Sequence, residues 1–118
     1  MGVWQWALGV VGVGGLTYLG LPKLLSLLGL HPRYKGPSRD LSGQRALIVT
    51  TSQGTLGETG KQTGVWASEM TVPYYEFLAA GMQVDLASIR GGEIPIEPSS
   101  LRWPVAAPAD RRFLSDPE

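Results

Sequence analysis

The 118 residues contain no cysteine, no asparagine and a single histidine, His31. Without cysteine, the chain as given has no disulfide, no thiolate metal ligand and no thiol nucleophile. Without asparagine it has no acceptor for N-linked glycosylation. A lone histidine beside Pro32 makes neither a metal cage nor a catalytic dyad. We therefore interpret His31 as a solvated linker residue and predict no metal site and no cofactor.

Formal charge is also missing from the first 22 residues. Val3 to Leu21, at about 1.5 Å per helical residue, spans roughly 28 Å, close to the hydrocarbon thickness of a bilayer. We predict a single transmembrane helix over residues 1–22. A cleaved secretory signal fits less well because no Lys or Arg precedes the run and no cleavage motif follows it. A buried core helix would need a larger soluble remainder, and an interfacial helix would need a charged face.

Aromatic and glycine residues are placed in this run as they are in membrane helices. Trp4, Trp6 and Tyr18 lie towards its two ends, and together with Lys23 they are the predicted membrane-interface residues. Small residues offer a surface on which another helix could pack, although no strict GxxxG motif occurs and glycine is common in membrane helices in any case. These predicted helix-packing residues are Gly9, Gly12, Gly15 and Gly20.

Charge divides the chain into two opposite halves. Residues 1–39 contain four basic residues and no acidic one, whereas residues 40–118 contain six basic and ten acidic residues. The positive-inside rule then predicts a single-pass membrane protein whose N-terminus lies outside and whose soluble part is cytoplasmic. The basic residues after the helix suit anionic lipid heads. The acidic soluble part argues against nucleic acid as a partner.

Residues 23–44 are predicted to form a juxtamembrane segment and linker. Pro22 is expected to break or kink the helix, and Leu24 to Leu30 is an apolar stretch too short to span a membrane. His31 to Gly43 is rich in Pro, Gly, Ser and charge, which is typical of an exposed linker.

Residues 45–118 have the pattern of an α/β domain. Ala46 to Thr50 fits a strand buried on both faces of a parallel sheet. Val65 to Ala80 has helical spacing, with Pro73 at the first turn of a second helical piece or at a kink, and Gly81 is a natural helix end. Met82 to Ile89 is the second predicted strand, and we expect one further short helix at Asp110 to Leu114.

The segment between the first strand and the helix superficially resembles a phosphate-binding P-loop. The P-loop pattern G-x-x-x-x-G-K-[ST] requires glycine at position 55 and Ser or Thr at position 62, where this chain has Thr55 and Gln62. We therefore interpret the segment as a flexible active-site-type loop at the carboxyl end of the first strand, where open α/β sheets place their sites.

Several stretches after residue 45 carry a family resemblance: TGVW (Thr63 to Trp66), Glu69 four residues before Pro73, the PYYEF segment, LAAGMQVDLAS and GGEIPIEP. Residues 45–118 resemble the N-terminal half of the ThiJ/PfpI superfamily, which has the class I glutamine amidotransferase-like fold. The resemblance implies a partial flavodoxin-like β-α-β half-domain. Members of the family have glyoxalase, deglycase, protease-like or chaperone activities.

The chemistry of that family depends on a cysteine at a nucleophile elbow, usually beside a histidine, with a carboxylate from the position of Glu69. By the resemblance, the cysteine and histidine would follow Glu118. Glu69 alone has no thiol or imidazole to activate, and an acidic residue is also favoured by the dipole at the first turn of a helix.

Two functions remain open. We expect a non-catalytic, membrane-anchored accessory subunit that packs on a larger integral membrane complex, for instance an energy-transducing one. A two-strand unit with unpaired sheet edges should need such a partner. The alternative is a fragment of a membrane-anchored ThiJ/PfpI-type enzyme of the glyoxalase, deglycase or amidotransferase-like kind, with its cysteine and histidine beyond Glu118.

Overall fold

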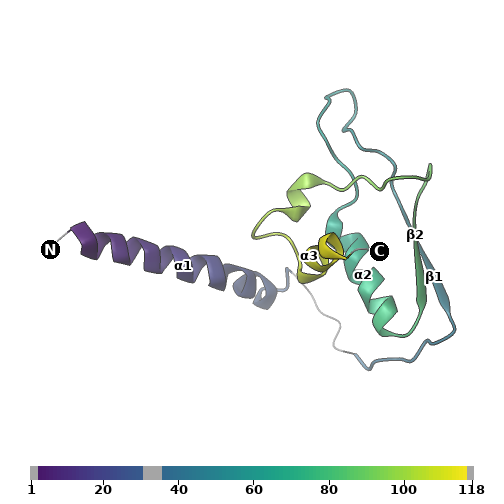
Figure 1. The fold of residues 1–118 in the computed structure, drawn as a ribbon, viewed down its shortest axis with the longest axis horizontal. Coiled ribbons are helices and arrows are strands. Elements are labelled where there is room, and N and C mark those ends of the chain that lie inside the picture. Colours follow the sequence, from purple (N-terminus) through teal and green to yellow (C-terminus); the bar gives the residue numbers. More distant parts are fainter. Residues whose placement is uncertain (1–2, 31–35, 117–118) are drawn as a thin grey trace. The chain divides into compact units, whose positions relative to one another are not determined.

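The computed structural model describes the backbone of residues 3–30 and 36–116, and side chains from Gly9 onward within those ranges. The chain divides into two compact units, Met1–Lys35 and Gly36–Glu118, which are described separately. The first contains helix α1. The second contains, in chain order, β1, α2, β2, the 3-10 helix η1 and α3 (Figure 1).

Helix α1 runs from Val3 to Leu27 and has Pro22 inside it. Of the two outcomes expected at Pro22, a break or a kink, the break does not occur, because proline removes one backbone donor but leaves the following residues free to bond four positions back. The helix ends instead near Gly29, whose φ is 79°, with the Leu30 N–H donating to the Leu25 carbonyl at 3.0 Å. Leu24 to Leu27 is thus part of α1 rather than a separate apolar element.

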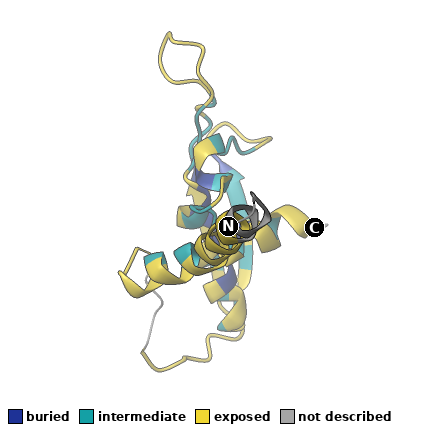
Figure 2. Cartoon of the chain, turned by 90° about the vertical axis from the view of Figure 1, so that its left-hand side faces the viewer, coloured by how far each residue is buried: buried dark blue, intermediate teal, exposed yellow. Residues whose placement is uncertain are grey.

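The segment Gly9–Leu27 of α1 is long and apolar enough to cross a membrane, a length and composition that membrane helices share with signal sequences. Its described residues are exposed along nearly the whole helix (Figure 2). This segment overlaps the predicted span Val3 to Leu21 and continues past Pro22. Helix α1 is therefore one continuous apolar helix that could serve as a membrane anchor.

The second unit is a mixed α/β fold built on a two-stranded parallel sheet. Strand β1 (Arg45–Thr50) pairs with β2 (Gln83–Ser88), and α2 (Ala67–Ala79) connects them across one face (Figure 1). The strand, helix and strand predicted from the sequence are confirmed. Pro73 lies inside a single helix, because α2 continues on both sides of it, and Gly81 follows the helix with a φ of 86°.

Only one face of the sheet is covered by described residues. Along β1 the alternate residues Ala46, Ile48 and Thr50 are partly or fully buried, whereas Leu47 and Val49 are 62% and 59% exposed. The prediction of a strand buried on both faces is therefore wrong for this structure. The reason is that α2 packs on the sheet and α3 packs on α2, so both helices lie on the same side.

The small core of the second unit lies between α2 and the C-terminal segment. Helix α3 (Pro108–Ser115) confirms the short helix expected at Asp110 to Leu114 and begins two residues earlier. The Asp110 carboxylate is buried there and accepts hydrogen bonds from the Thr71 hydroxyl at 2.6 Å and from the Ala107 N–H at 2.7 Å. These bonds fix α3 against α2.

A further short helix, η1 (Pro98–Leu101), precedes α3. Its buried Ser100 hydroxyl accepts a hydrogen bond from the Ala67 N–H at 3.1 Å and donates one to the Glu97 carbonyl at 2.6 Å. The first residue of α2 thus receives its capping acceptor from a segment 33 positions later in the chain.

Candidate functional site

The chain leaves β1 through a hairpin rather than an irregular loop. Thr55 and Gln62 form an antiparallel bridge, and the Thr63 N–H donates to the Gly54 carbonyl at 3.1 Å. Gly57 and Gly60, with φ of 51° and 70°, allow the chain to reverse at the tip. The predicted active-site-type loop is therefore a hairpin, and its tip is exposed (Figure 2).

After the hairpin the chain crosses the segment that follows β2. The Val65 N–H donates to the Pro95 carbonyl at 2.9 Å, and the Glu97 N–H donates to the Val65 carbonyl at 3.0 Å. Gly64 lies so close to this segment that a Cβ atom there would be 2.2 Å from the Pro95 carbonyl oxygen. Position 64 therefore requires glycine because of this close approach.

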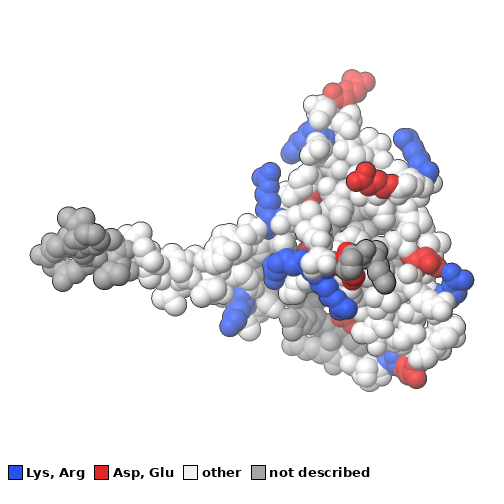
Figure 3. All heavy atoms as spheres, viewed as in Figure 1, with Lys and Arg blue, Asp and Glu red and all other residues white. Residues whose placement is uncertain are grey.

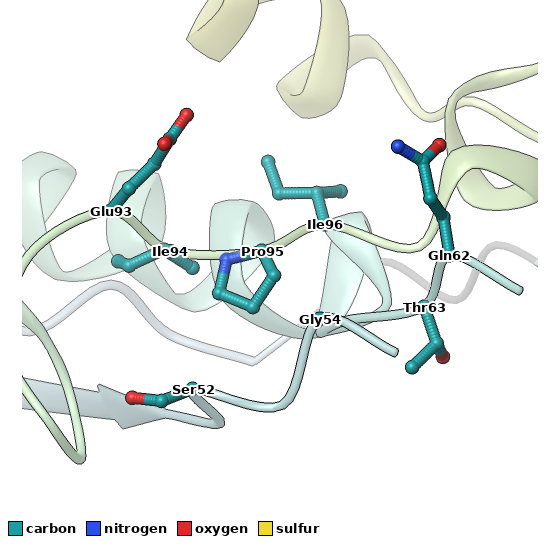
Figure 4. Close-up of a pocket in the computed structure, with 8 residues that line it drawn as sticks. All are labelled: Ser52, Gly54, Gln62, Thr63, Glu93, Ile94, Pro95 and Ile96. Carbon is teal, nitrogen blue, oxygen red and sulfur yellow. The ribbon is translucent and has the colours of Figure 1, made fainter. Parts of the chain in front are cut away.

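These two segments enclose an open crevice of about 370 Å³ beyond the carboxyl ends of β1 and β2 (Figure 4). Its lining residues are Ser52, Gly54, Gln62, Thr63, Glu93, Ile94, Pro95 and Ile96. The Ser52 hydroxyl accepts a hydrogen bond from the Arg90 N–H at 2.8 Å and so links the two segments. Crevices at this edge of open α/β sheets commonly bind ligands.

The side chains around the crevice are polar and partly acidic. Gln62 and Glu93 point to one side of it and Thr63 to the other (Figure 4). Glu97 follows the lining residue Ile96 in the chain. Its pKa is held below the usual value chiefly by a hydrogen bond from the Ser99 hydroxyl, with smaller contributions from the Thr63 hydroxyl and the Ser99 N–H. The crevice thus presents one carboxylate, that of Glu93, and one side-chain amide, that of Gln62, whose oxygens suit hydrogen-bond donors on a ligand. Its eight lining residues include no cysteine or histidine, so they supply no thiol or imidazole nucleophile.

The residue predicted from the family motif lies apart from this crevice. Glu69 is exposed on the first turn of α2 and is not among the lining residues. No group of three or more acidic or histidine side chains within the described part of the chain is placed to hold a metal ion.

The predicted membrane residues lie on α1. Tyr18 and Lys23 are exposed. A Cβ atom added at Gly9, Gly12, Gly15 or Gly20 would meet no other atom within 4 Å. The side chains of Trp4 and Trp6, and the whole of His31, lie outside the described residues.

Three residues that shape the site were missed by the sequence analysis. They are Gly64 and Pro95, which make the close crossing, and Ser100, which caps α2. The only sequence signal was Pro98, because proline is favoured at the first position of a helix. The partner of each residue is distant in sequence, so the contacts themselves leave no local pattern.

No family model matches the chain, and no curated protein matches it. A solved structure does: the X-ray structure of Rapid Encystment Protein 24 KDa (REP24) from Francisella tularensis is 39% identical over the aligned residues, with a TM-score of 0.57. The alignment covers 63% of this chain and 32% of REP24. This chain thus spans about a third of REP24 and is similar to that part in both sequence and fold.

Proposed function

We propose that this protein is a non-catalytic accessory subunit, anchored by α1 in a membrane, whose α/β unit packs against an integral membrane protein complex. The observation that carries the proposal is the uncovered face of the β1–β2 sheet. Its other support is the apolar length of α1. We also propose that the α/β unit lies in the cytoplasm, which the positive-inside rule supports through the basic residues on the C-terminal side of α1.

The uncovered face has the composition of an interface rather than of a solvated surface. Leu47 and Val49 are more than half exposed, and Ile89, directly after β2, is 75% exposed. The Arg45 guanidinium and the Asp85 carboxylate form a 2.8 Å ion pair across the two strands, which neutralises the charge at the other end of this face. An apolar patch with a balanced charge beside it suits burial against another protein.

The experiment compares two lysine substitutions in the native membrane. Leu47 lies on the uncovered face and Leu56 on the hairpin, and they are similarly exposed at 62% and 52%. Leu47→Lys therefore tests the face and Leu56→Lys is the matched control. The chain is purified in mild detergent, its intact mass is measured, and the stoichiometry of each co-purifying protein is determined.

We expect a mass near 12.7 kDa and a stoichiometric partner that is retained by Leu56→Lys and lost by Leu47→Lys. A chain of this mass that migrates alone would contradict the proposal. Equal retention by both variants would also contradict it, because the uncovered face would then not be the contact.

A second candidate function is that of a membrane-anchored ThiJ/PfpI-type enzyme. The match to REP24, of which this chain spans about a third, favours a longer domain, and the residues that resemble the ThiJ/PfpI family, Thr63 to Trp66 and Glu69, point to the enzyme. In this proposal β1, α2 and β2 form part of a flavodoxin-like domain in a longer chain. The nucleophilic cysteine and its histidine follow Glu118, and Glu69 supplies the family carboxylate.

The same mass measurement separates the two functions. A mass near twice 12.7 kDa favours the enzyme, whose methylglyoxal consumption should then vanish when the downstream cysteine is replaced by alanine. Activity that survives this replacement would exclude the family mechanism.

A further inference from the structure

Basic side chains gather at one place on the second unit. Arg102, Arg111 and Arg112 lie within an eleven-residue stretch, and all three are exposed. The Arg111 guanidinium donates to the Ala106 carbonyl at 2.9 Å, and the Ala106 N–H donates to the Arg102 carbonyl at 2.9 Å. These bonds bring the end of η1 beside α3, and Figure 3 shows basic side chains near both elements.

Two large apolar side chains that are close to these arginines in the sequence are also exposed. Leu114 is 60% exposed on α3, and Trp103 is 46% exposed directly after Arg102. On α3, Asp110 is buried and the Phe113 ring packs edge-on against the Tyr74 ring, whereas Arg111, Arg112 and Leu114 are exposed. We call Arg102, Trp103, Arg111, Arg112 and Leu114 the basic surface.

The described acidic groups near this surface accept hydrogen bonds from within the unit. Asp110 is buried and accepts two hydrogen bonds. Asp116 accepts a hydrogen bond from the Tyr75 hydroxyl at 3.1 Å, and the Arg112 guanidinium lies 4.0 Å from the centre of the Tyr75 ring. Glu97, at the start of η1, accepts hydrogen bonds from the Ser99 N–H at 3.3 Å and from the Ser99 hydroxyl at 2.8 Å. The basic surface is therefore a local exception on a unit whose acidic residues outnumber its basic ones.

We propose that the basic surface lies on the headgroups of an anionic bilayer and so orients the α/β unit at the membrane. The inference rests on the membrane anchor of the proposed function. Arginine matches lipid phosphate with paired donors, and tryptophan favours the headgroup region. Residues 28–44 connect α1 to β1 and reach at most about 60 Å when fully extended. A tethered surface stays near the bilayer, so even weak contacts hold it there.

The chain has no cysteine, so one introduced cysteine can be labelled without a background. Ser115→Cys places a polarity-sensitive NBD fluorophore beside the basic surface while leaving its five residues intact. Glu58→Cys, at the exposed hairpin, is the control position. The full chain is reconstituted into vesicles of phosphatidylcholine alone or with 30% phosphatidylserine, and carbonate extraction reports whether α1 is inserted.

In the anionic vesicles the emission of the label at position 115 should shift to the blue and intensify, whereas the label at position 58 should not change. Replacing the three arginines by glutamine should lower the ratio of bound to released unit about fivefold per arginine. Replacing them by lysine should restore binding, which separates loss of charge from loss of folding.

The inference would be overturned if the chain stayed in the vesicles after carbonate extraction but the label at position 115 had the same emission with and without phosphatidylserine. The proposed anchor would then still stand. Equal shifts at positions 115 and 58, or a shift that survives the glutamine variant, would also overturn the inference. Extraction of the chain by carbonate would instead overturn the proposed anchor, and the inference with it.

Discussion

Substitution of Gly64 by alanine should weaken the crossing that forms the crevice. A Cβ atom at position 64 would lie 2.2 Å from the Pro95 oxygen, 2.3 Å from the Pro95 carbonyl carbon and 2.6 Å from the Ile96 nitrogen. All three neighbours are backbone atoms, so no side chain can rotate away. Because nonbonded heavy atoms pack at about 3.5–4 Å, the two segments must separate by at least about 1 Å.

That separation would break the two hydrogen bonds of the crossing. They now join the Val65 N–H to the Pro95 oxygen at 2.9 Å and the Glu97 N–H to the Val65 oxygen at 3.0 Å. Each backbone hydrogen bond contributes about 0.5–1.5 kcal/mol net, so Gly64→Ala should lower the free energy of unfolding by about 1–3 kcal/mol. Gly54 is the control, because a Cβ atom there would lie 3.5 Å from the Pro95 Cβ atom, an ordinary contact. Gly54→Ala should cost less than about 0.5 kcal/mol.

Denaturant unfolding of the full chain in detergent measures both variants by circular dichroism. Amide hydrogen exchange at Val65 and Glu97 then shows whether the loss occurs at the crossing. The reasoning would be refuted if Gly64→Ala unfolded within about 0.5 kcal/mol of Gly54→Ala and kept both amides protected.

Two further predictions concern the segment after β2. Ser100→Ala should lower the free energy of unfolding by about 1–2 kcal/mol, because the buried Ala67 N–H loses its acceptor, whereas Ser115→Ala on exposed α3 should have little effect. Equal stabilities of the two variants would argue against a capping role for Ser100. The lowered pKa of Glu97, caused first by the Ser99 hydroxyl, means that its stabilisation is complete above the ordinary value of 4.5 and is lost as the pH falls through the lower, folded value. The stability difference between the native chain and Glu97→Gln should therefore shrink between about pH 6 and about pH 2, and a constant difference would contradict this assignment.

The regular elements of the second unit could be predicted from local patterns. Each was recognised from the residues of the element itself: the first strand from the apolar run Ala46 to Thr50, the helix from its spacing before Gly81, and the second strand from Met82 to Ile89. The burial of the sheet could not be predicted this way. A short apolar run such as Leu47 to Val49 fits a strand covered on both faces, and its neighbours in space decide how many faces are covered.

The prolines and the crevice also show that local sequence patterns do not determine contacts made by the folded chain. Pro22 and Pro73 are helix-breaking signals, yet both lie inside continuous helices, because one missing donor does not prevent later residues from bonding. Gly64 and Ser100 act on Pro95 and Ala67, each about 30 residues away. Contacts at that separation are set by the fold, so single-sequence patterns do not contain them.

The pairing register of the sheet has a consequence for how the second unit folds. Each residue of β1 pairs with the residue 38 positions later, from Arg45 with Gln83 to Thr50 with Ser88. During synthesis the sheet therefore cannot form until Ser88 has left the ribosome, and the chain between the strands must then be closed into a loop at an entropic cost. Formation of α2 shortens the span that must close. The folding rate of the unit thus depends on the helical propensity of thirteen residues that never enter the sheet.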